Sequence, residues 1–114
     1  MEVYDTARQL AKQLSESAEY AAYAEAKAAA GENETTRVLI DEYHRLQIRA
    51  QAAVVSGKQD AEAMQKLQKI GELLQFDKIA SQYLMAEFRL NRMLSDVYKM
   101  LADAVGIDLS TLEA

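Results

Sequence analysis

Apolar side chains recur at steps of three and four residues along nearly the whole chain. Under this spacing Val3, Leu10 and Leu14 share one side of a first helix. Near the other end an apolar residue returns every seven positions, which is typical of a helix with a packing seam. This row consists of Phe76, Tyr83, Leu90, Val97 and Ala104. The periodicity predicts helices over residues 3–14, 18–30, 34–56, 60–74 and 77–105.

Capping residues mark where each predicted helix should begin or end. Ser17, Asp60 and Asp77 each precede a periodic segment, and their side-chain oxygens can accept hydrogen bonds from its first turn. Gly31 and Asn33 form the clearest break, because glycine tolerates the conformation that follows a helix and asparagine can cap the next one. Two further glycines end the later helices, Gly57 and Gly106.

These elements predict an all-α fold of about five helices in a single domain over residues 1–114. Proline is absent and the chain is rich in residues that favour helices, which supports this class. The two longest helices, 34–56 and 77–105, are expected to form a long hairpin within a bundle. Many of the hydrophobic residues are alanines, so the core should be thin and a homodimer is expected to complete it.

The seam of the two long helices is the predicted association surface. Amphipathic tyrosines and large aliphatic side chains suit interfaces that are solvated in the free protein and become packed on association. The residues assigned to this surface are Leu39, Tyr43, Leu46, Tyr83, Leu90, Leu94 and Val97. A charge placed at Leu46 or Leu90 is expected to disrupt assembly, because an unpaired charge is unfavourable in an apolar seam.

Net charge argues against general binding to nucleic acid. The formal charge is −5, whereas nucleic-acid and lipid surfaces attract a positive field. A local basic stripe is the alternative, with contacts from Arg45, Arg49, Arg89 and Arg92. Acidic neighbours one turn away, such as Asp41 before Arg45, favour a self-neutralised surface instead.

Residues for catalysis or cofactor binding are few. The chain has no cysteine and a single histidine, His44, which is expected to be a structural or solvated residue rather than a ligand or a general base. We therefore expect no enzyme activity, no metal site and no cofactor. The acidic start does not resemble a signal peptide and no apolar run is long enough to span a membrane, so a cytoplasmic protein is expected.

Several short motifs resemble the YlbF/YmcA/YheA family of small helical bacterial proteins. The first motifs are Glu19-Tyr20, Tyr23 and Ala26-Lys27. After the Gly31 break come Leu39-Ile40-Asp41-Glu42-Tyr43 and Leu46-Gln47, and Ala86-Glu87 lies in the last helix. The resemblance spans about Val3 to Val105 and rests on packing residues rather than on a catalytic signature.

The resemblance implies an all-α dimeric protein of Gram-positive bacteria without enzymatic activity, linked to competence, sporulation and biofilm control. Better-known members of that family act through a complex that steers ribonuclease Y in mRNA processing. Those members carry cysteines that help to hold iron–sulfur clusters, and this chain has none, which favours the YheA branch. The expected function is a regulatory adaptor whose partners are a second copy, family members or ribonuclease Y. A nucleic-acid-binding regulator and a purely structural, self-associating scaffold are the alternatives.

Overall fold

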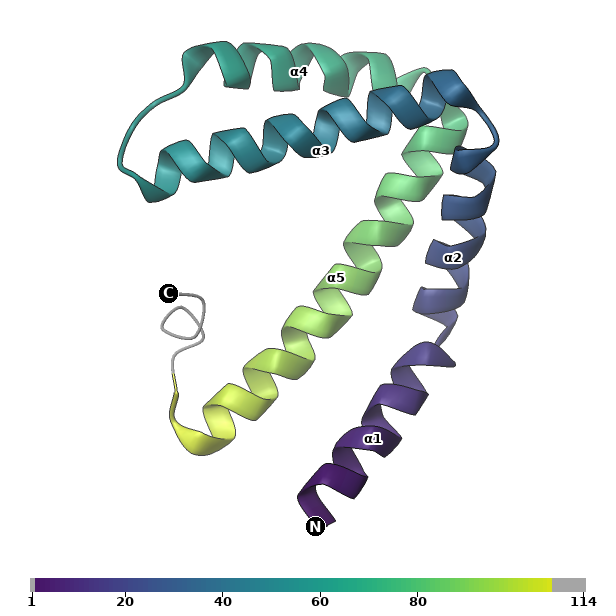
Figure 1. The fold of residues 1–114 in the computed structure, drawn as a ribbon, viewed down its shortest axis with the longest axis vertical. Coiled ribbons are helices and arrows are strands. Elements are labelled where there is room, and N and C mark those ends of the chain that lie inside the picture. The colour runs from purple at the N-terminus through teal and green to yellow at the C-terminus, as the bar shows by residue number, and fades with distance from the viewer. Residues whose placement is uncertain (1, 108–114) are drawn as a thin grey trace. The chain divides into compact units, whose positions relative to one another are not determined.

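The computed structural model describes residues 2–107, and every regular element in that range is an α-helix (Figure 1). The helices are α1 (Glu2–Ser15), α2 (Ala18–Gly31), α3 (Glu34–Val55), α4 (Ala61–Gln75) and α5 (Lys78–Val105). The predicted all-α class with five helices is confirmed over these residues. Each observed helix end lies within one residue of the predicted end.

Side-chain caps start four of the helices. At α2 the Tyr20 amide donates to Ser17 Oγ at 3.1 Å, and at α3 the Thr36 amide donates to Asn33 Oδ1 at 3.1 Å. Asp60 accepts from the Ala63 amide at 3.0 Å, and Asp77 accepts from the Ala80 amide at 3.1 Å. Each bond satisfies an amide that has no partner within its own helix, which is why the helices begin at these residues.

Two glycines adopt the left-handed conformation that ends a helix. Gly57 has φ 74° after α3, and Gly106 has φ 70° after α5. Residues with a Cβ rarely adopt this conformation, so these positions favour glycine. The chain can therefore turn directly after each of the two longest helices.

The chain divides into two compact units. Unit 1 contains the residues up to Tyr23 and those from Met85 onward, and unit 2 contains residues 24–84. The division falls inside α2 and inside α5. That residues 1–114 form a single domain stays a prediction.

Unit 2 is built on an antiparallel hairpin of α3 and α4, which lie side by side (Figure 1). The sequence suggested a hairpin of 34–56 with 77–105 and did not fix the place of the helix between them. The long hairpin is present, but its second arm is α4. The buried apolar residues of this unit are Ala30, Ile40, Leu46, Ala63, Leu74, Ala80 and Tyr83.

One polar side chain is fully buried among these apolar residues. Thr36 is only 2% exposed, and its hydroxyl donates to Asp77 Oδ2 at 2.6 Å. A buried hydroxyl without a partner would be unfavourable by about 1–3 kcal/mol, so this bond matters for the fold. It holds the cap of α5 against the first turn of α3.

Unit 1 buries much less of its apolar surface. None of the 14 residues that the structure describes in α1 is buried, and only Leu10 and Leu14 are half-buried. In the part of α5 that belongs to this unit, the buried residues are alanines, Ala86 and Ala102. A helix of this length is marginal in water unless its apolar face is covered. The described chain therefore leaves α1 with incomplete burial.

Acid should weaken the fold partly through Asp77. The Thr36 hydroxyl, and then the Ala80 amide, hold the pKa of the Asp77 carboxyl below its ordinary value. A carboxyl with a lowered pKa in the folded state stabilises the fold above its unfolded pKa, and this stabilisation is lost as the pH falls through the folded pKa. We expect Asp77→Asn, which keeps a capping oxygen, to flatten the fall in urea midpoint between about pH 5 and about pH 2.

Thr36→Val is the companion variant, because it removes the hydroxyl and should raise the pKa of Asp77 in a carbon-detected NMR titration. If the urea midpoint of Asp77→Asn fell with pH as steeply as that of the unmodified protein, this account would be contradicted.

Candidate protein-association surfaces

The predicted association residues fall into two groups. Leu39, Tyr43, Leu46 and Tyr83 belong to unit 2, whereas Leu90, Leu94 and Val97 belong to unit 1. Leu46 is 4% exposed and Tyr83 is 7% exposed, so both already pack within the single chain. Leu39 and Tyr43 are half-buried on α3. A substitution at Leu46 would therefore destabilise the hairpin core, so its effect on assembly could not be separated from its effect on folding.

The three residues on α5 behave differently. Leu90, Leu94 and Val97 are half-buried, and the same row continues to Leu101, which is 56% exposed. Seven- and eleven-residue steps return to nearly the same side of a helix, so these residues share one face. The face is therefore more exposed at Leu101, near the C-terminal end of α5, although it remains apolar.

A similar apolar row lies on α1. Val3 is 72% exposed, and Leu10 and Leu14 are half-buried on the same side of the helix. We call the residues of these two rows the unit 1 apolar set. It comprises Val3, Leu10, Leu14, Leu90, Leu94, Val97 and Leu101. A set of this kind on two amphipathic helices is typical of a surface that another protein chain covers.

The basic residues proposed for nucleic-acid contact are divided between the two units in the same way. Arg45 Nη2 lies 2.7 Å from Glu42 Oε2, so its partner is Glu42 rather than the expected Asp41. Arg49 Nε donates to Asp60 Oδ2 at 2.7 Å, and Nη2 donates to Oδ1 at 3.1 Å. The other two arginines, Arg89 and Arg92, are exposed on α5 in unit 1.

Asp60 combines two interactions at the start of α4. The Ala63 amide, followed by the Arg49 guanidinium, holds the pKa of its carboxyl below the ordinary value. The same hydrogen bond to Asp60 raises the pKa of Arg49. Glu62 also lies near this pair, at 3.7 Å from Arg49 Nη2, and a bond from Lys66 lowers its pKa. Three cations of the hairpin, Arg45, Arg49 and Lys66, are thus paired with nearby carboxylates.

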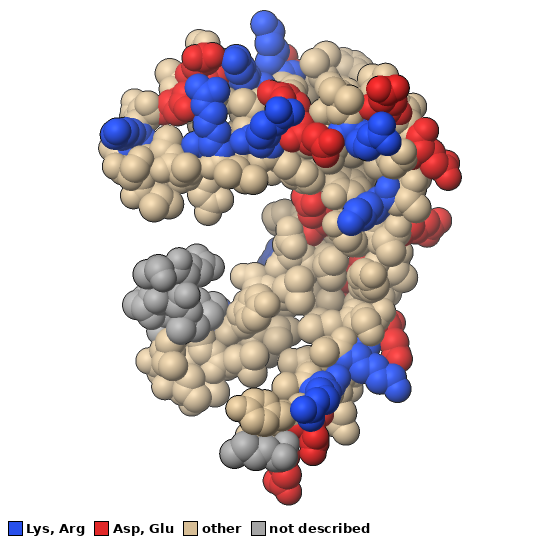
Figure 2. Space-filling view, in the orientation of Figure 1, with Lys and Arg blue, Asp and Glu red and all other residues tan. Residues whose placement is uncertain are grey.

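The surface of the hairpin reflects this pairing. Figure 2 shows blue and red side chains intermixed over α3 and α4, without a continuous basic stripe on that face. Nucleic-acid backbones bind where several cations act together. The hairpin face in this view does not have such an arrangement.

His44 lies in an aromatic cluster with Tyr43 and Tyr83. Its ring centroid is 6.0 Å from that of Tyr83 and 6.4 Å from that of Tyr43, and the side chain is half-buried. The reason is that α5 begins beside α3, which places Tyr83 over His44.

Phe76 was assigned to the seven-residue row of the last helix, and this assignment is wrong. Phe76 forms the C-cap of α4, before α5 begins, and is 89% exposed. It matched the period only because the spacing continues through the turn. The next row member, Tyr83, is the first one inside α5.

A groove that was not predicted from the sequence lies at the loop that joins α3 to α4. It has a volume of about 290 Å³ and is lined by Ala53, Val54, Lys58 and Met64 among others. Val54 is 74% exposed and the adjacent Val55 is 82% exposed. The signal in the sequence was the apolar run Ala52–Val55, which ends two residues before Gly57, where an ordinary surface helix would end in polar residues.

No metal-binding group of three or more His, Asp or Glu side chains exists among residues 2–107. None of the helices described there combines the length and apolar character needed to cross a bilayer.

Comparison with known proteins identifies the family of this chain. The family described as "Control of competence regulator ComK, YlbF/YmcA" matches residues 3–106. The chain belongs to this family. It is 37% identical over 108 residues to a UPF0342 protein of Symbiobacterium thermophilum, covering 94% of this chain and 96% of that protein. A UPF0342 protein of Desulfitobacterium hafniense is 35% identical over 111 residues, covering 92% and 86%, and one of Halothermothrix orenii is 31% identical over 114 residues, covering 99% and 97%.

The YlbF/YmcA match spans both units and all five helices. The family description is that of a regulator of competence, and it states no reaction.

Arg49→Gln should loosen the start of α4. The variant removes both hydrogen bonds to Asp60, so the amides of the first turn, including that of Ala63, should exchange faster with solvent hydrogen. Arg45→Gln is the matched control, because Arg45 pairs within α3. NMR-detected exchange showing equal acceleration in the two variants would mean that the Arg49–Asp60 pair does not join the two helices.

Proposed function

We propose that this protein is a non-enzymatic regulatory adaptor that acts as a homodimer through protein–protein association. In this proposal the protein controls competence, sporulation or biofilm formation. It does so by binding an RNA-processing partner such as ribonuclease Y, or a related family member. The family description as a competence regulator supports the regulatory part. The observation that carries the associative part is the absence of any buried residue among those described in α1.

The stability of the α1 helix depends on how much of its apolar face is covered. Short helices gain most of their stability from burying an apolar face. Val3 is largely exposed, and Leu10 and Leu14 are only half covered. A second chain that covers the unit 1 apolar set would supply the missing burial. Burying a fully exposed large aliphatic side chain contributes about 1.5–3 kcal/mol, and the half-buried members of the set gain less than this.

An adaptor of this kind acts by presenting a binding surface to its partner and does not itself catalyse a reaction. Dimerisation through the unit 1 apolar set would order α1 and the second half of α5. The loop-end groove beside Val54 and Met64 offers a different apolar surface that a partner could contact. A purely structural scaffold is the nearest alternative, and it differs only in leaving the partner's activity unchanged.

Direct nucleic-acid binding is less favoured by the charges. Arg45 and Arg49 are engaged by Glu42 and Asp60, which leaves Arg89 and Arg92 as the exposed members of the predicted set. The formal charge of −5 opposes approach to a phosphate backbone. This alternative predicts that binding of partners depends on intact RNA.

The central test is a charge introduced into the unit 1 apolar set. Leu90→Glu should convert the dimer to a monomer, because an unpaired carboxylate in an apolar interface is strongly unfavourable. Leu101→Glu should act in the same direction while sparing the single chain, since Leu101 is 56% exposed there. Phe88→Glu is the matched control at an exposed position on another side of α5. Light scattering measures the mass, and circular dichroism checks the helix content.

The same proteins then serve as tagged baits in the native cells. We expect the unmodified protein to recover a ribonuclease or a family member with or without nuclease treatment, and Leu101→Glu to recover less of it. Recovery that vanishes with nuclease would instead favour the nucleic-acid alternative. A single mass for all variants, equal to that of the unmodified protein, would contradict the proposed interface.

A further inference from the structure

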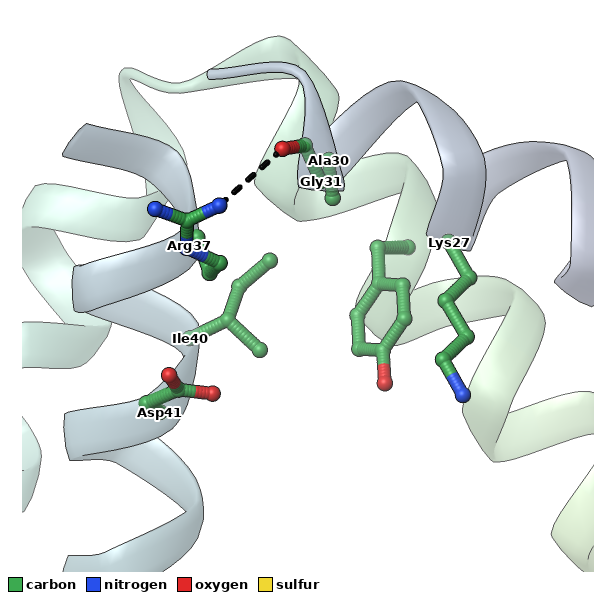
Figure 3. Close-up of a pocket in the computed structure, with 7 residues that line it drawn as sticks. Lys27, Ala30, Gly31, Arg37, Ile40 and Asp41 are labelled. Carbon is green, nitrogen blue, oxygen red and sulfur yellow. Dashed lines mark hydrogen bonds between the residues drawn. The ribbon is translucent and has the colours of Figure 1, made fainter. Parts of the chain in front are cut away.

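A second cavity lies inside unit 2, between α2, α3 and the start of α5. Its volume is about 220 Å³, and Figure 3 shows the side chains that line it. Lys27 and Gly31 come from α2, Arg37 and Asp41 come from α3, and Tyr83 comes from α5. All of them belong to residues 24–84, so the cavity is formed by one compact unit.

The inner surface of this cavity is apolar. Ala30 and Ile40 are each 4% exposed, and Tyr83 is 7% exposed, yet all three border the open volume. Ligand sites commonly combine such an apolar surface with a few charged groups that fix orientation. The volume is suited to a body no larger than a leucine or phenylalanine molecule.

The charged groups of the cavity are arranged in an unusual way. Arg37 and Asp41 are four residues apart on α3, the spacing at which opposite charges on a helix ordinarily pair. Among the ion pairs of the described residues, none joins them. Arg37 Nη1 instead donates to the Gly31 carbonyl oxygen at 3.3 Å.

Figure 3 shows Arg37 and Asp41 on either side of Ile40, with Lys27 on the facing wall. One positive and one negative group thus flank an apolar contact point, separated by about one helical turn of 5.4 Å. A guanidinium has five N–H donors, so its bond to Gly31 leaves capacity for a carboxylate.

From this arrangement we propose that the cavity binds a small zwitterion with an apolar body, namely a free apolar α-amino acid. The ligand's carboxylate binds Arg37, its ammonium binds Asp41, and its side chain contacts Ile40 and Tyr83. An α-amino acid carries its ammonium and carboxylate groups on the same carbon atom, so one small molecule can reach both groups of α3. This inference goes beyond the adaptor function and does not depend on it.

The ligand chemistry can be tested with three probes on the full-length protein. L-leucine carries both charges, 4-methylpentanoate lacks the ammonium group, and 3-methylbutan-1-amine lacks the carboxylate. Binding is followed by NMR shifts of the Ala30 and Ile40 methyl groups, which border the cavity. We expect L-leucine to bind with a Kd of about 1 mM or lower. Each analogue should bind about fivefold more weakly, the effect of one partly exposed ion pair.

Gly31→Leu tests the location without straining the backbone. A Cβ at Gly31 meets no atom within 4 Å, and Gly31 is not among the glycines with positive φ. The leucine side chain should occupy space at the cavity wall and weaken binding of L-leucine about tenfold or more. Gly71→Leu is the matched control, because Gly71 also has open space around it but lies in α4, away from the cavity.

Asp41→Asn tests the orientation of the ligand. This exposed residue can change without loss of a described ion pair, and the variant should bind L-leucine about as weakly as 4-methylpentanoate, whose own affinity should not fall. Three results would each overturn the proposal. They are the absence of methyl shifts at about 10 mM L-leucine, equal affinity for the three probes, and unchanged binding in Gly31→Leu.

Discussion

The hydrogen bond from Thr36 to Asp77 is the constraint on which unit 2 depends. Asp77 caps α5 through the Ala80 amide and also accepts the buried Thr36 hydroxyl, 41 residues away in the chain. Because Thr36 is 2% exposed, no solvent can replace that partner. The bond therefore fixes the start of α5 beside the start of α3, which brings Tyr83 against His44 and closes one wall of the amino-acid-sized cavity. Asp60 acts similarly for α4, since it caps that helix and binds Arg49 of α3.

Local signals explain which features could be predicted from the sequence. Asp60 and Asp77 were recognisable as caps, and Gly57 and Gly106 as helix ends, because each acts within a few residues. The second interaction of each aspartate was not predictable, since its partner lies on another helix. Spacing also cannot separate a core residue from an interface residue. Leu46 and Leu90 share the same pattern, but only Leu46 is buried in the single chain.

The two units differ in how far they satisfy their own apolar surfaces. Unit 2 buries large leucine, isoleucine and tyrosine side chains in addition to alanines, whereas the buried residues of unit 1 on α5 are all alanines. This difference is what connects the fold to the proposed function in the YlbF/YmcA family. In our account unit 2 folds around its own contacts and carries the ligand cavity, and unit 1 depends on a second chain.

Hydrogen exchange measured over a range of protein concentrations tests that account most directly. If a second chain covers unit 1, the amides of α1 and of α5 beyond Leu90 should lose protection on dilution from about 100 μM to about 0.1 μM. The amides of α3 and α4 should keep theirs over the same range. Protection of α1 that is high and independent of concentration, in a protein that is monomeric throughout, would contradict the account.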